Sequence, residues 1–236
     1  MSVAAISDIH GNLPALEAVL ADIEREGVDE IVVAGDSVSG PWPAEVFDLL
    51  DEAGARIVHG NADRADEVAR FSQEVAVWNA SRLGSRRLAT VATWPSTVAV
   101  DIEGLGRVLV CHSTPSSDLP IYTRITPDEE VLTLLGSVEA DVLVCGHTHM
   151  QYDRTLSNGL RLVNPGSVGM PYEGRPGAFW ALLGPDVAFR HSAYDIDAAV
   201  AAMGVLGAPR QEDAENLLTP PGSDETTEYF ESLRAS

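Results

Sequence analysis

Short apolar segments rich in β-branched residues alternate with helix-patterned segments at the start of the chain. The apolar segments are residues 3–6, 31–34 and 56–58, and the helical patterns between them cover residues 13–26 and 43–52. A strand–helix–strand order of this kind produces parallel strands, because each helix carries the chain back to the start of the next strand. Both faces of a parallel sheet need cover, so the pattern predicts an α/β domain with a helix-covered sheet.

The remainder divides into a helical part, a strand-rich part and an acidic end. Residues 64–94 have a mostly helical pattern and are predicted to form an insertion after the third strand. Strand-like runs then occur at residues 97–102, 107–111, 141–145, 151–156, 160–163, 178–183 and 187–190. Turn residues between the last four runs predict antiparallel hairpins, and we expect the second half to form a second sheet. The expected domain covers residues 1–200, followed at residues 201–236 by an acidic C-terminal tail or a docked helix.

The composition is strongly acidic. There are 36 Asp and Glu residues against 15 basic residues, all of them Arg, which gives a formal charge of −21. Because such a chain repels polyanions at long range, we expect no binding to polymeric nucleic acid or to membranes. No apolar run reaches about 18 residues, and the first residues lack the pattern of a signal peptide, so we expect a cytoplasmic protein. The sequence gives no indication of an oligomeric state.

Metal-binding residue types stand directly after the predicted strands. They are Asp8, His10, Asp36, Asn61, His112, His147 and His149. The carboxyl ends of strands in an open α/β sheet deliver side chains from distant segments to one crevice, so we expect these residues to converge. Carboxylate and imidazole donors together suit Mn, Fe, Ni or Zn better than Ca, and the number of donors indicates two ions. Asp36 is the best candidate for a bridging ligand, because a carboxylate offers two oxygens.

Spacing within the donor set adds to the metal hypothesis. In Asp8-Ile-His10 and His147-Thr-His149, the i, i+2 spacing places both side chains on one side of an extended segment, where each pair can reach a common centre. A single histidine after a strand is more often a hydrogen-bonded structural residue, as we expect for His59 and His191. The two cysteines, Cys111 and Cys145, are expected to be small core residues. The combination of donors carries the hypothesis, because convergence from several strands rarely arises by accident.

Five motifs in a fixed order resemble the calcineurin-like metallophosphoesterases. They are Asp8-x-His10, Gly35-Asp36, Gly60-Asn61-x-Asp63, a strand ending in His112, and Gly146-His147-x-His149. The run Asn164-Pro-Gly-Ser167 adds a resemblance to the small bacterial and archaeal phosphodiesterase branch. The resemblance implies an α/β fold in which a β-sandwich of two mixed sheets is flanked by helices, a four-layer αββα arrangement. It also implies that one ion is held by Asp8, His10, Asp36 and His149, and the other by Asp36, Asn61, His112 and His147.

The activity that the resemblance implies is that of a metal-dependent hydrolase, a phosphodiesterase or phosphatase. A hydroxide bridging two divalent ions would attack a phosphodiester or phosphoanhydride bond of a small phosphate ester or nucleotide. Mn is the expected metal, with Fe, Ni, Zn or Mg as alternatives. We assign catalytic roles to Asp36, Asn61 and His112, and substrate contacts to Asn61 and His112.

Two further residues that follow ligand segments are candidate substrate contacts. Asn12 and Arg64 could each bind a phosphate oxygen. Asn12 could equally be a helix cap, and Arg64 a solvated charge on a helix surface. Both interpretations remain open for both residues.

Two positions depart from the pattern of the family. Many members carry a histidine directly after Gly-Asn, a proposed proton donor to the leaving group, and here that position is Ala62. Without this donor we expect a preference for leaving groups that are stable anions, such as a phosphate or an activated phenolate. Asp63 could replace the donor, although a cap or an ion pair is the commoner role of such a residue. After His112, Ser113-Thr-Pro replaces the usual glycine, which makes that loop less permissive.

Three rival functions remain. Gly35-Asp36-Ser37 matches the opening of a serine esterase, but the late Asp-x-x-His pair of such an enzyme is missing because Ala188 stands three residues before His191. A non-catalytic metal-binding or protein-interaction scaffold of the same fold is a second rival. The third is a dinucleoside polyphosphate hydrolase, in which arginines between residues 64 and 87 bind the additional phosphates. Those arginines could instead pair with the abundant acidic residues.

Overall fold

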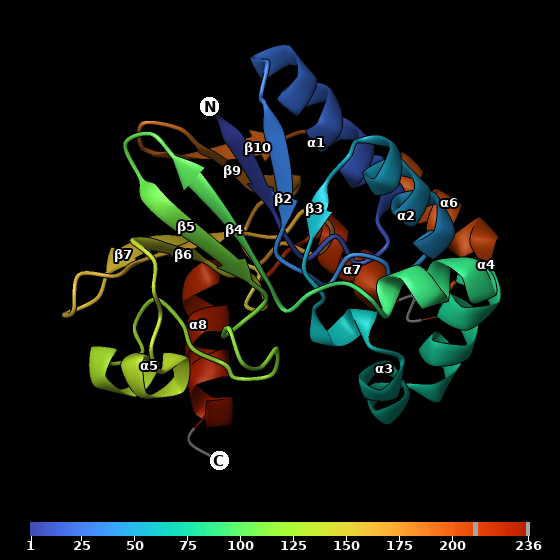
Figure 1. The fold of residues 1–236 in the computed structure, drawn as a ribbon. Helices are drawn as coiled ribbons and strands as arrows, with labels where there is room; N and C mark the ends of the chain where they lie inside the picture. The colour runs from blue at the N-terminus through green and yellow to red at the C-terminus, as the bar shows by residue number, and fades with distance from the viewer. Residues whose placement is uncertain (210–211, 235–236) are drawn as a thin grey trace.

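Two five-stranded mixed sheets face each other, and helices cover their outer faces (Figure 1). The computed structural model describes residues 1–209 and 212–234, with the side chains of residues 212–213 excluded. The four-layer arrangement of helix, sheet, sheet and helix confirms the predicted fold class. None of the helices within the described ranges combines the length and the apolar character needed to cross a membrane.

The first sheet contains the strand–helix–strand units that open the chain. Its strand order is β10 (Val187–Ser192), β9 (Ala178–Leu183), β1 (Val3–Ile6), β2 (Glu30–Val33) and β3 (Arg56–Ile57). Strands β1, β2 and β3 are parallel, and they are connected by α1 (Leu13–Glu26) and α2 (Pro43–Glu52). The side-chain oxygen of Asn12 accepts a hydrogen bond from the N–H of Ala15 and so caps α1. The predicted βαβαβ pattern is confirmed.

The second sheet has the strand order β4 (Thr97–Ile102), β5 (Gly106–Cys111), β6 (Val142–Val144), β8 (Arg161–Pro165) and β7 (Gln151–Thr155). Its three central strands, β5, β6 and β8, are parallel. Helix α5 (Asp128–Leu135) packs on its outer face through Val131 and Leu135. Cys111 and Cys145 are buried in the same cluster, as expected for core residues.

The hairpin of β9 and β10 belongs to the first sheet, so the prediction that the late strands all form the second sheet was wrong. Strand β9 pairs antiparallel with the free edge of β1, with Ala4 opposite Leu182. Its side chains are apolar on both faces: Trp180 packs towards the helices, and Leu183 packs between the sheets. A strand of this kind needs cover on both faces, and the position beside β1 supplies it.

The alternation of side chains along β1 divides the core into two layers. Val3 and Ala5 lie between the sheets, together with valines of β5, β6 and β8. Ala4 and Ile6 point the opposite way and pack against α1 and α2. Because β1 is buried on both faces, its carboxyl end is held rigidly in the middle of the sandwich.

Two groups of helices extend beyond the sandwich. After the 3₁₀ turn η1 (Asn61–Asp63), helices α3 (Ala65–Phe71) and α4 (Gln73–Val91) form one group, and α4 is interrupted at Gly84, where φ is 69°. The C-terminal group contains α6 (Ile196–Leu206), α7 (Glu212–Leu218) and α8 (Ser223–Arg234). Helix α8 runs beside α5 and the second sheet (Figure 1).

Hydrogen bonds and ion pairs hold α8 in this position. The hydroxyl of Thr123 donates to Oε1 of Glu231 at 2.6 Å, and Arg234 donates to Glu130 of α5 at 2.6 Å. Thr227 of α8 contacts the buried Met150. The acidic end of the chain therefore contributes a helix that contacts both α5 and the loop before β7.

Candidate metal centre

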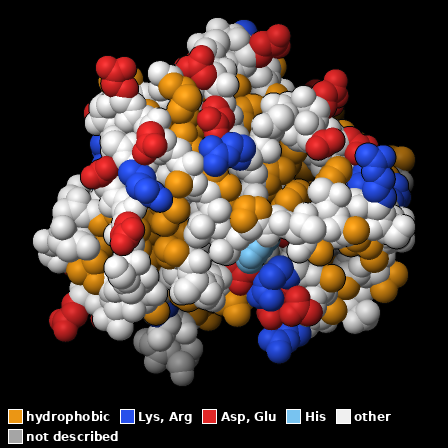
Figure 2. Space-filling view, in the orientation of Figure 1, with side chains coloured by type: hydrophobic (Ala, Val, Ile, Leu, Met, Phe, Trp, Pro, Cys, Tyr) orange, Lys and Arg blue, Asp and Glu red, His pale blue; other side chains and the backbone are white. Residues whose placement is uncertain are grey.

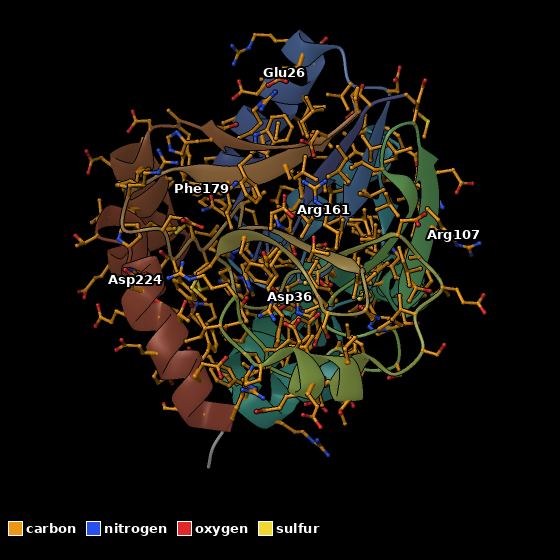
Figure 3. All side chains as sticks on the ribbon, turned by 90° about the vertical axis from the view of Figure 1, so that its left-hand side faces the viewer. Glu26, Asp36, Arg107, Arg161, Phe179 and Asp224 are labelled. Atoms are coloured by element: carbon orange, nitrogen blue, oxygen red, sulfur yellow. The ribbon has the colours of Figure 1, made fainter. Side chains whose placement is uncertain are left out.

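The predicted ligands meet at the edge where parallel strands of both sheets end. Asp8 follows β1, Asp36 follows β2, His112 follows β5, and His147 and His149 follow β6. Figure 3 shows Asp36 deep within the molecule, well away from Glu26 and Arg107 at its rim. The two sheets therefore supply candidate ligands from opposite sides of one cleft.

The backbone of the ligand loops is left-handed at five of these residues. Among the described residues, the non-glycine residues with positive φ are Asp8 (52°), His10 (46°), Asp36 (53°), His147 (71°) and His149 (60°). Such conformations are uncommon for residues with a side chain, and they concentrate at functional sites. The prediction that the paired ligands lie on extended segments was wrong, because the chain turns at each ligand.

The ligand atoms form two clusters. Those of Asp8, His10 and His149 lie within 4.8 Å of one another, and so do those of Asp36, His112 and His147. Asp8 and His10 share a centre as expected from their spacing, but His147 and His149 belong to different clusters.

Asp36 lies between the two clusters. Its Oδ2 atom is 3.8 Å from Nε2 of His10 and 3.4 Å from Nε2 of His112. Asn61 belongs to the second cluster, since its Oδ1 atom is 3.1 Å from Nε2 of His112. With this geometry, the Asp36 carboxylate could help to hold an ion at either cluster.

Backbone carbonyls orient two of the imidazole rings. Nδ1 of His112 lies 2.7 Å from the carbonyl oxygen of Ala34, and Nδ1 of His149 lies 2.7 Å from that of Met170. A carbonyl oxygen can only accept, so the ring proton sits on Nδ1 when the imidazole is neutral. Each Nε2 atom then presents its lone pair to the centre, as a metal ligand must.

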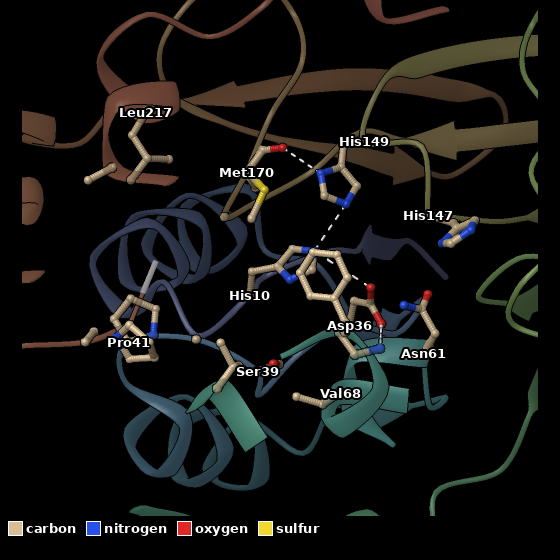
Figure 4. Close-up of a pocket in the computed structure, with 18 of the residues that line it drawn as sticks. His10, Asp36, Ser39, Pro41, Asn61, Val68, His147, His149, Met170 and Leu217 are labelled. Carbon is tan, nitrogen blue, oxygen red and sulfur yellow. Dashed lines mark hydrogen bonds and ion pairs between the residues drawn. The ribbon is translucent and has the colours of Figure 1, made fainter. Parts of the chain in front are cut away.

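The residues fit a pair of cations. Nε2 of His149 lies 3.1 Å from Nε2 of His10 (Figure 4) and 3.3 Å from Oδ1 of Asp8. Lone pairs and carboxylates crowded in this way repel one another unless a cation or a proton lies between them. The mixture of nitrogen and oxygen donors suits first-row transition metals.

Charges within the cleft shift the ionisation of the ligands. Burial lowers the pKa of His10 to about 4 and that of His147 to about 4, so both imidazoles are neutral near pH 7. Burial also acts to lower the pKa of His112, but the Asp36 carboxylate outweighs it and raises that pKa to about 10. For Asp36, burial acts to raise the pKa, whereas the imidazole of His112 and its neighbours hold it below the usual range.

Glycines in the motifs let the ligand loops pack against each other. A Cβ atom on Gly60 would lie 2.1 Å from Oδ1 of Asp36, and one on Gly146 would lie 2.5 Å from Oδ2 of Asp8. Both distances are far inside van der Waals contact. The Gly-Asn and Gly-His motifs therefore need glycine for space.

Asp63 braces the loops around Asp36. Its carboxylate accepts hydrogen bonds from the N–H groups of Ser37 (2.8 Å), Val38 (3.0 Å) and Gly60 (2.9 Å). These bonds match the structural role expected for Asp63 as an alternative to proton donation.

Ser37, the nucleophile of the rival esterase hypothesis, is fully buried, and its hydroxyl has no hydrogen-bond partner among the described residues. A hydrolytic serine needs a base, which Ser37 lacks here.

The two candidate phosphate contacts are engaged by protein groups. Besides capping α1, Asn12 donates from its amide to the carbonyl oxygen of Gly169 at 3.1 Å. Arg64 forms two hydrogen bonds to Asp118, at 2.6 and 3.0 Å, in a cavity of about 290 Å³ that His112 also lines. Their assignment as substrate contacts stays a prediction.

The two remaining histidines lie outside both clusters. His59 also contacts Asp118, at 3.2 Å, and Nε2 of His191 lies 2.9 Å from the carbonyl oxygen of Pro176. Both histidines are hydrogen-bonded, as expected. Figure 2 shows a histidine side chain reaching the surface near the middle of one face, with arginine and acidic side chains directly below it.

A larger cavity, of about 360 Å³, opens beside the metal ligands. Its wall includes His10, Asp36, His147 and His149, and it continues between α3, α4 and the C-terminal helices. The apolar residues of this wall were not among the predicted site residues. Apolar positions in the C-terminal segment, such as Met203 and Leu217, were the sequence feature that could have indicated this wall.

A two-sheet sandwich with clusters of candidate metal ligands at the strand ends is the arrangement of a metallophosphoesterase type of hydrolase. Residues 1–183 match the model of the calcineurin-like phosphoesterase superfamily domain, and the chain belongs to this superfamily. The chain is accordingly an enzyme, a hydrolase, and its family is metal-dependent.

Relatives and solved structures agree with this assignment. The chain is 28% identical over 199 residues to phosphodiesterase YfcE of Escherichia coli K12, a match that covers 79% of this chain and 89% of YfcE. The crystal structure of a metallophosphoesterase from Sphaerobacter thermophilus is 29% identical, with a TM-score of 0.73, covering 93% of this chain and 98% of that one. Hypothetical protein PH1004 from Pyrococcus horikoshii OT3 has the same fold, with a TM-score of 0.79 at 18% identity, covering 94% and 99% of the two chains.

Proposed function

We propose that this protein is a phosphoesterase with a dinuclear metal centre that hydrolyses phosphodiester or phosphoanhydride bonds of small molecules. The observation that carries the proposal is the pair of ligand clusters with the Asp36 carboxylate between them. The similarity to phosphodiesterase YfcE supports the diester as the substrate class. Location in the cytoplasm stays a prediction from the sequence.

The proposed ligands of the first ion are Asp8, His10, Asp36 and His149, and those of the second are Asp36, Asn61, His112 and His147. Two divalent ions in these positions would activate water near neutral pH and neutralise charge on the phosphoryl oxygens. We propose Mn as the native metal because the site mixes carboxylate, amide and imidazole donors.

Residues of the chain hold the proposed ligands and the substrate in fixed orientations. The carbonyls of Ala34 and Met170 keep the rings of His112 and His149 in the tautomer that presents Nε2. Asn61 lines the 360 Å³ cavity and His112 lines the 290 Å³ cavity. We assign to both residues the additional role of contacting the phosphoryl group. Holding substrate and ligands in fixed geometry lowers the entropic part of the barrier.

The side chain of Ala62 lines the large cavity beside the ligands and cannot supply a proton. We therefore propose that good substrates have leaving groups that are stable as anions, such as phenolates and phosphates. The rate should then depend steeply on the leaving-group pKa, and a flat dependence would show that another group protonates the leaving oxygen.

The rival functions have weaker support. Arg64, Arg70 and Arg87 pair with acidic residues, which favours a surface role over binding of a polyphosphate chain. A scaffold that has lost catalysis would not need a complete set of ligand types.

The decisive experiment is an assay of phosphodiesters, phosphomonoesters and dinucleoside polyphosphates after chelation and reloading with Mn, Mg, Ni, Fe or Zn. We expect chelation to abolish diester hydrolysis and one metal, Mn, to restore it. Activity that survives complete removal of metal would refute the proposal.

A further inference from the structure

The 360 Å³ cavity changes character with distance from the metal ligands. One side carries Asn61 and His147, and the opposite side carries Leu217 and Pro41 (Figure 4). Between them lie the polar Ser39 and a mostly apolar stretch of the described wall. Its apolar side chains come from α3, α4, α7 and α8: Val68, Val75, Ala214, Leu217 and Phe230. A phosphoryl group at the metal ligands would thus direct the rest of its molecule into an apolar space.

Charge is sparse in the described part of this wall. Apart from the metal-ligand candidates, the charged residue that lines it is Glu67, which forms ion pairs with Arg64 and Arg70. No described arginine lines the cavity. A second phosphate or a ribose would therefore meet apolar side chains where it needs hydrogen-bond donors, and that mismatch is costly.

The size of the cavity limits the group that it can hold. Small-molecule sites have volumes of roughly 300–1,000 Å³, and an apolar cavity of about 150 Å³ is already enough for benzene. A volume of about 360 Å³ suits a phosphoryl group together with one aromatic ring or a medium-length alkyl chain.

Part of this wall lies outside the family domain. The domain match ends at residue 183, whereas Met203, Leu217 and Phe230 come from the C-terminal helices. The stacking of Tyr172 on His149, with ring centroids 4.8 Å apart, and the contact of Tyr172 with Phe230 connect these helices to the metal ligands. The C-terminal helices thus extend the apolar wall beyond the residues that the domain model matches.

We propose that the substrate is a phosphate ester whose organic group is apolar, an aryl or medium-length alkyl group, and that this group binds against Val68, Val75 and Leu217. The inference rests on the proposed phosphoesterase function and specifies its substrate class. It predicts that affinity rises with the apolar size of the organic group, whichever bond is cleaved.

The test uses non-hydrolysable phosphonates with the Mn-loaded full chain. Binding of methyl-, propyl- and hexylphosphonate is measured by isothermal titration calorimetry, with 2-hydroxyethylphosphonate as the polar match of propylphosphonate. We expect the Kd to fall about fourfold for each added methylene until the cavity is full. We expect the hydroxyl compound to bind more weakly than its propyl match.

Two variants in α4 test whether the cavity wall causes the rise in affinity with alkyl length. Val75 lines the cavity and is 8% exposed, whereas Val77 of the same helix is 60% exposed and does not line it. Val75→Thr should lower the ratio of hexylphosphonate affinity to methylphosphonate affinity several-fold. Val77→Thr should leave this ratio unchanged. Leu217→Asn, on α7, should also lower the ratio. It provides the same test if Val75→Thr does not fold.

The outcomes separate this inference from the proposed function. A Kd that is flat from methyl- to hexylphosphonate, in a protein that hydrolyses diesters, would overturn the apolar-substrate inference alone. The same holds if Val75→Thr and Leu217→Asn keep the full ratio. Failure of every metal to support hydrolysis would overturn the proposed function, and the inference would fall with it.

Discussion

The backbone N–H of Ala62 donates a 2.7 Å hydrogen bond to Oδ1 of Asp36. This bond fixes one oxygen of the carboxylate and leaves Oδ2 facing His10 and His112. Ala62, at the position where many members of the family carry a histidine, thus acts on the candidate metal centre through its backbone. Its side chain can be changed without removing that bond.

Ala62→His should add a proton donor to the cavity. We expect faster hydrolysis of diesters with alkyl leaving groups, by up to about 100-fold, because general acid catalysis is worth at least that much in favourable geometry. The measurement is the slope of log kcat against leaving-group pKa, which should become shallower. Ala62→Gln has a similar size without a suitable acid and should keep the steep slope; an equal change in both variants would contradict this account.

Asp36→Asn should abolish binding of the metal pair. The amide removes one negative charge from between the clusters, and we expect metal affinity to fall by more than about 100-fold, since even groups that only support ligands are worth about 10–100-fold. Metal content after dialysis, by mass spectrometry, should drop together with activity. Asp48→Asn, which removes a surface partner of Arg87, is the control and should retain both.

Gly60→Ala should disturb the Asp36 carboxylate. The new methyl would lie 2.1 Å from Oδ1 of Asp36, so the loops must shift, and overpacking of this kind costs about 1–3 kcal/mol. We expect a lower denaturation midpoint and weaker binding of Mn. Gly184→Ala, where nothing lies within 4 Å of the added carbon, should be nearly neutral; equal losses in both variants would show that the clash is not the cause.

The metal-free protein should lose stability as the pH rises above 6.5. The pKa of His112 is raised from 6.5 to about 10, so the folded state keeps a proton that the unfolded state releases between these values. Its stabilisation is complete below pH 6.5 and is lost on approach to pH 10. Urea midpoints in chelator at several pH values measure the slope, and His112→Gln should make it shallower, while His149, whose pKa is also raised beside Asp8, keeps part of it. A midpoint that rises over this range in the wild type would contradict the shift.

Much of the architecture follows from local sequence. Residues 3–6 and 13–26 form β1 and α1 as predicted, because a short β-branched run followed by a capped amphipathic pattern has few other stable solutions. The metal-ligand candidates were recognisable for a related reason. Polar residues that end a buried strand, such as Asp8 after β1, must emerge at the carboxyl edge of the sheet.

Tertiary contacts decided what local patterns could not. The apolar sequence of β9 predicts a strand but does not specify which sheet the strand joins. It joins the first sheet because the edge of β1 was free to pair with it. The left-handed turn at His10 depends on the bond from its N–H to the carbonyl oxygen of Asp36, at 2.9 Å, which belongs to a different loop. That turn, and the assignment of His147 and His149 to different clusters, need two distant segments to be in contact before either can form.

The sequence by itself determined which residues stand at the strand ends and the family to which they belong. The family resemblance also implied how the candidate ligands divide between two clusters, which local spacing had not given for His147 and His149. The tertiary structure alone decided that the C-terminal helices line the cavity beside them. The physical reason is that strand and helix propensities act over a few neighbouring residues. Packing brings residues such as Val68 and Leu217, which are far apart in the chain, to the wall of one cavity, and no short sequence pattern predicts that arrangement.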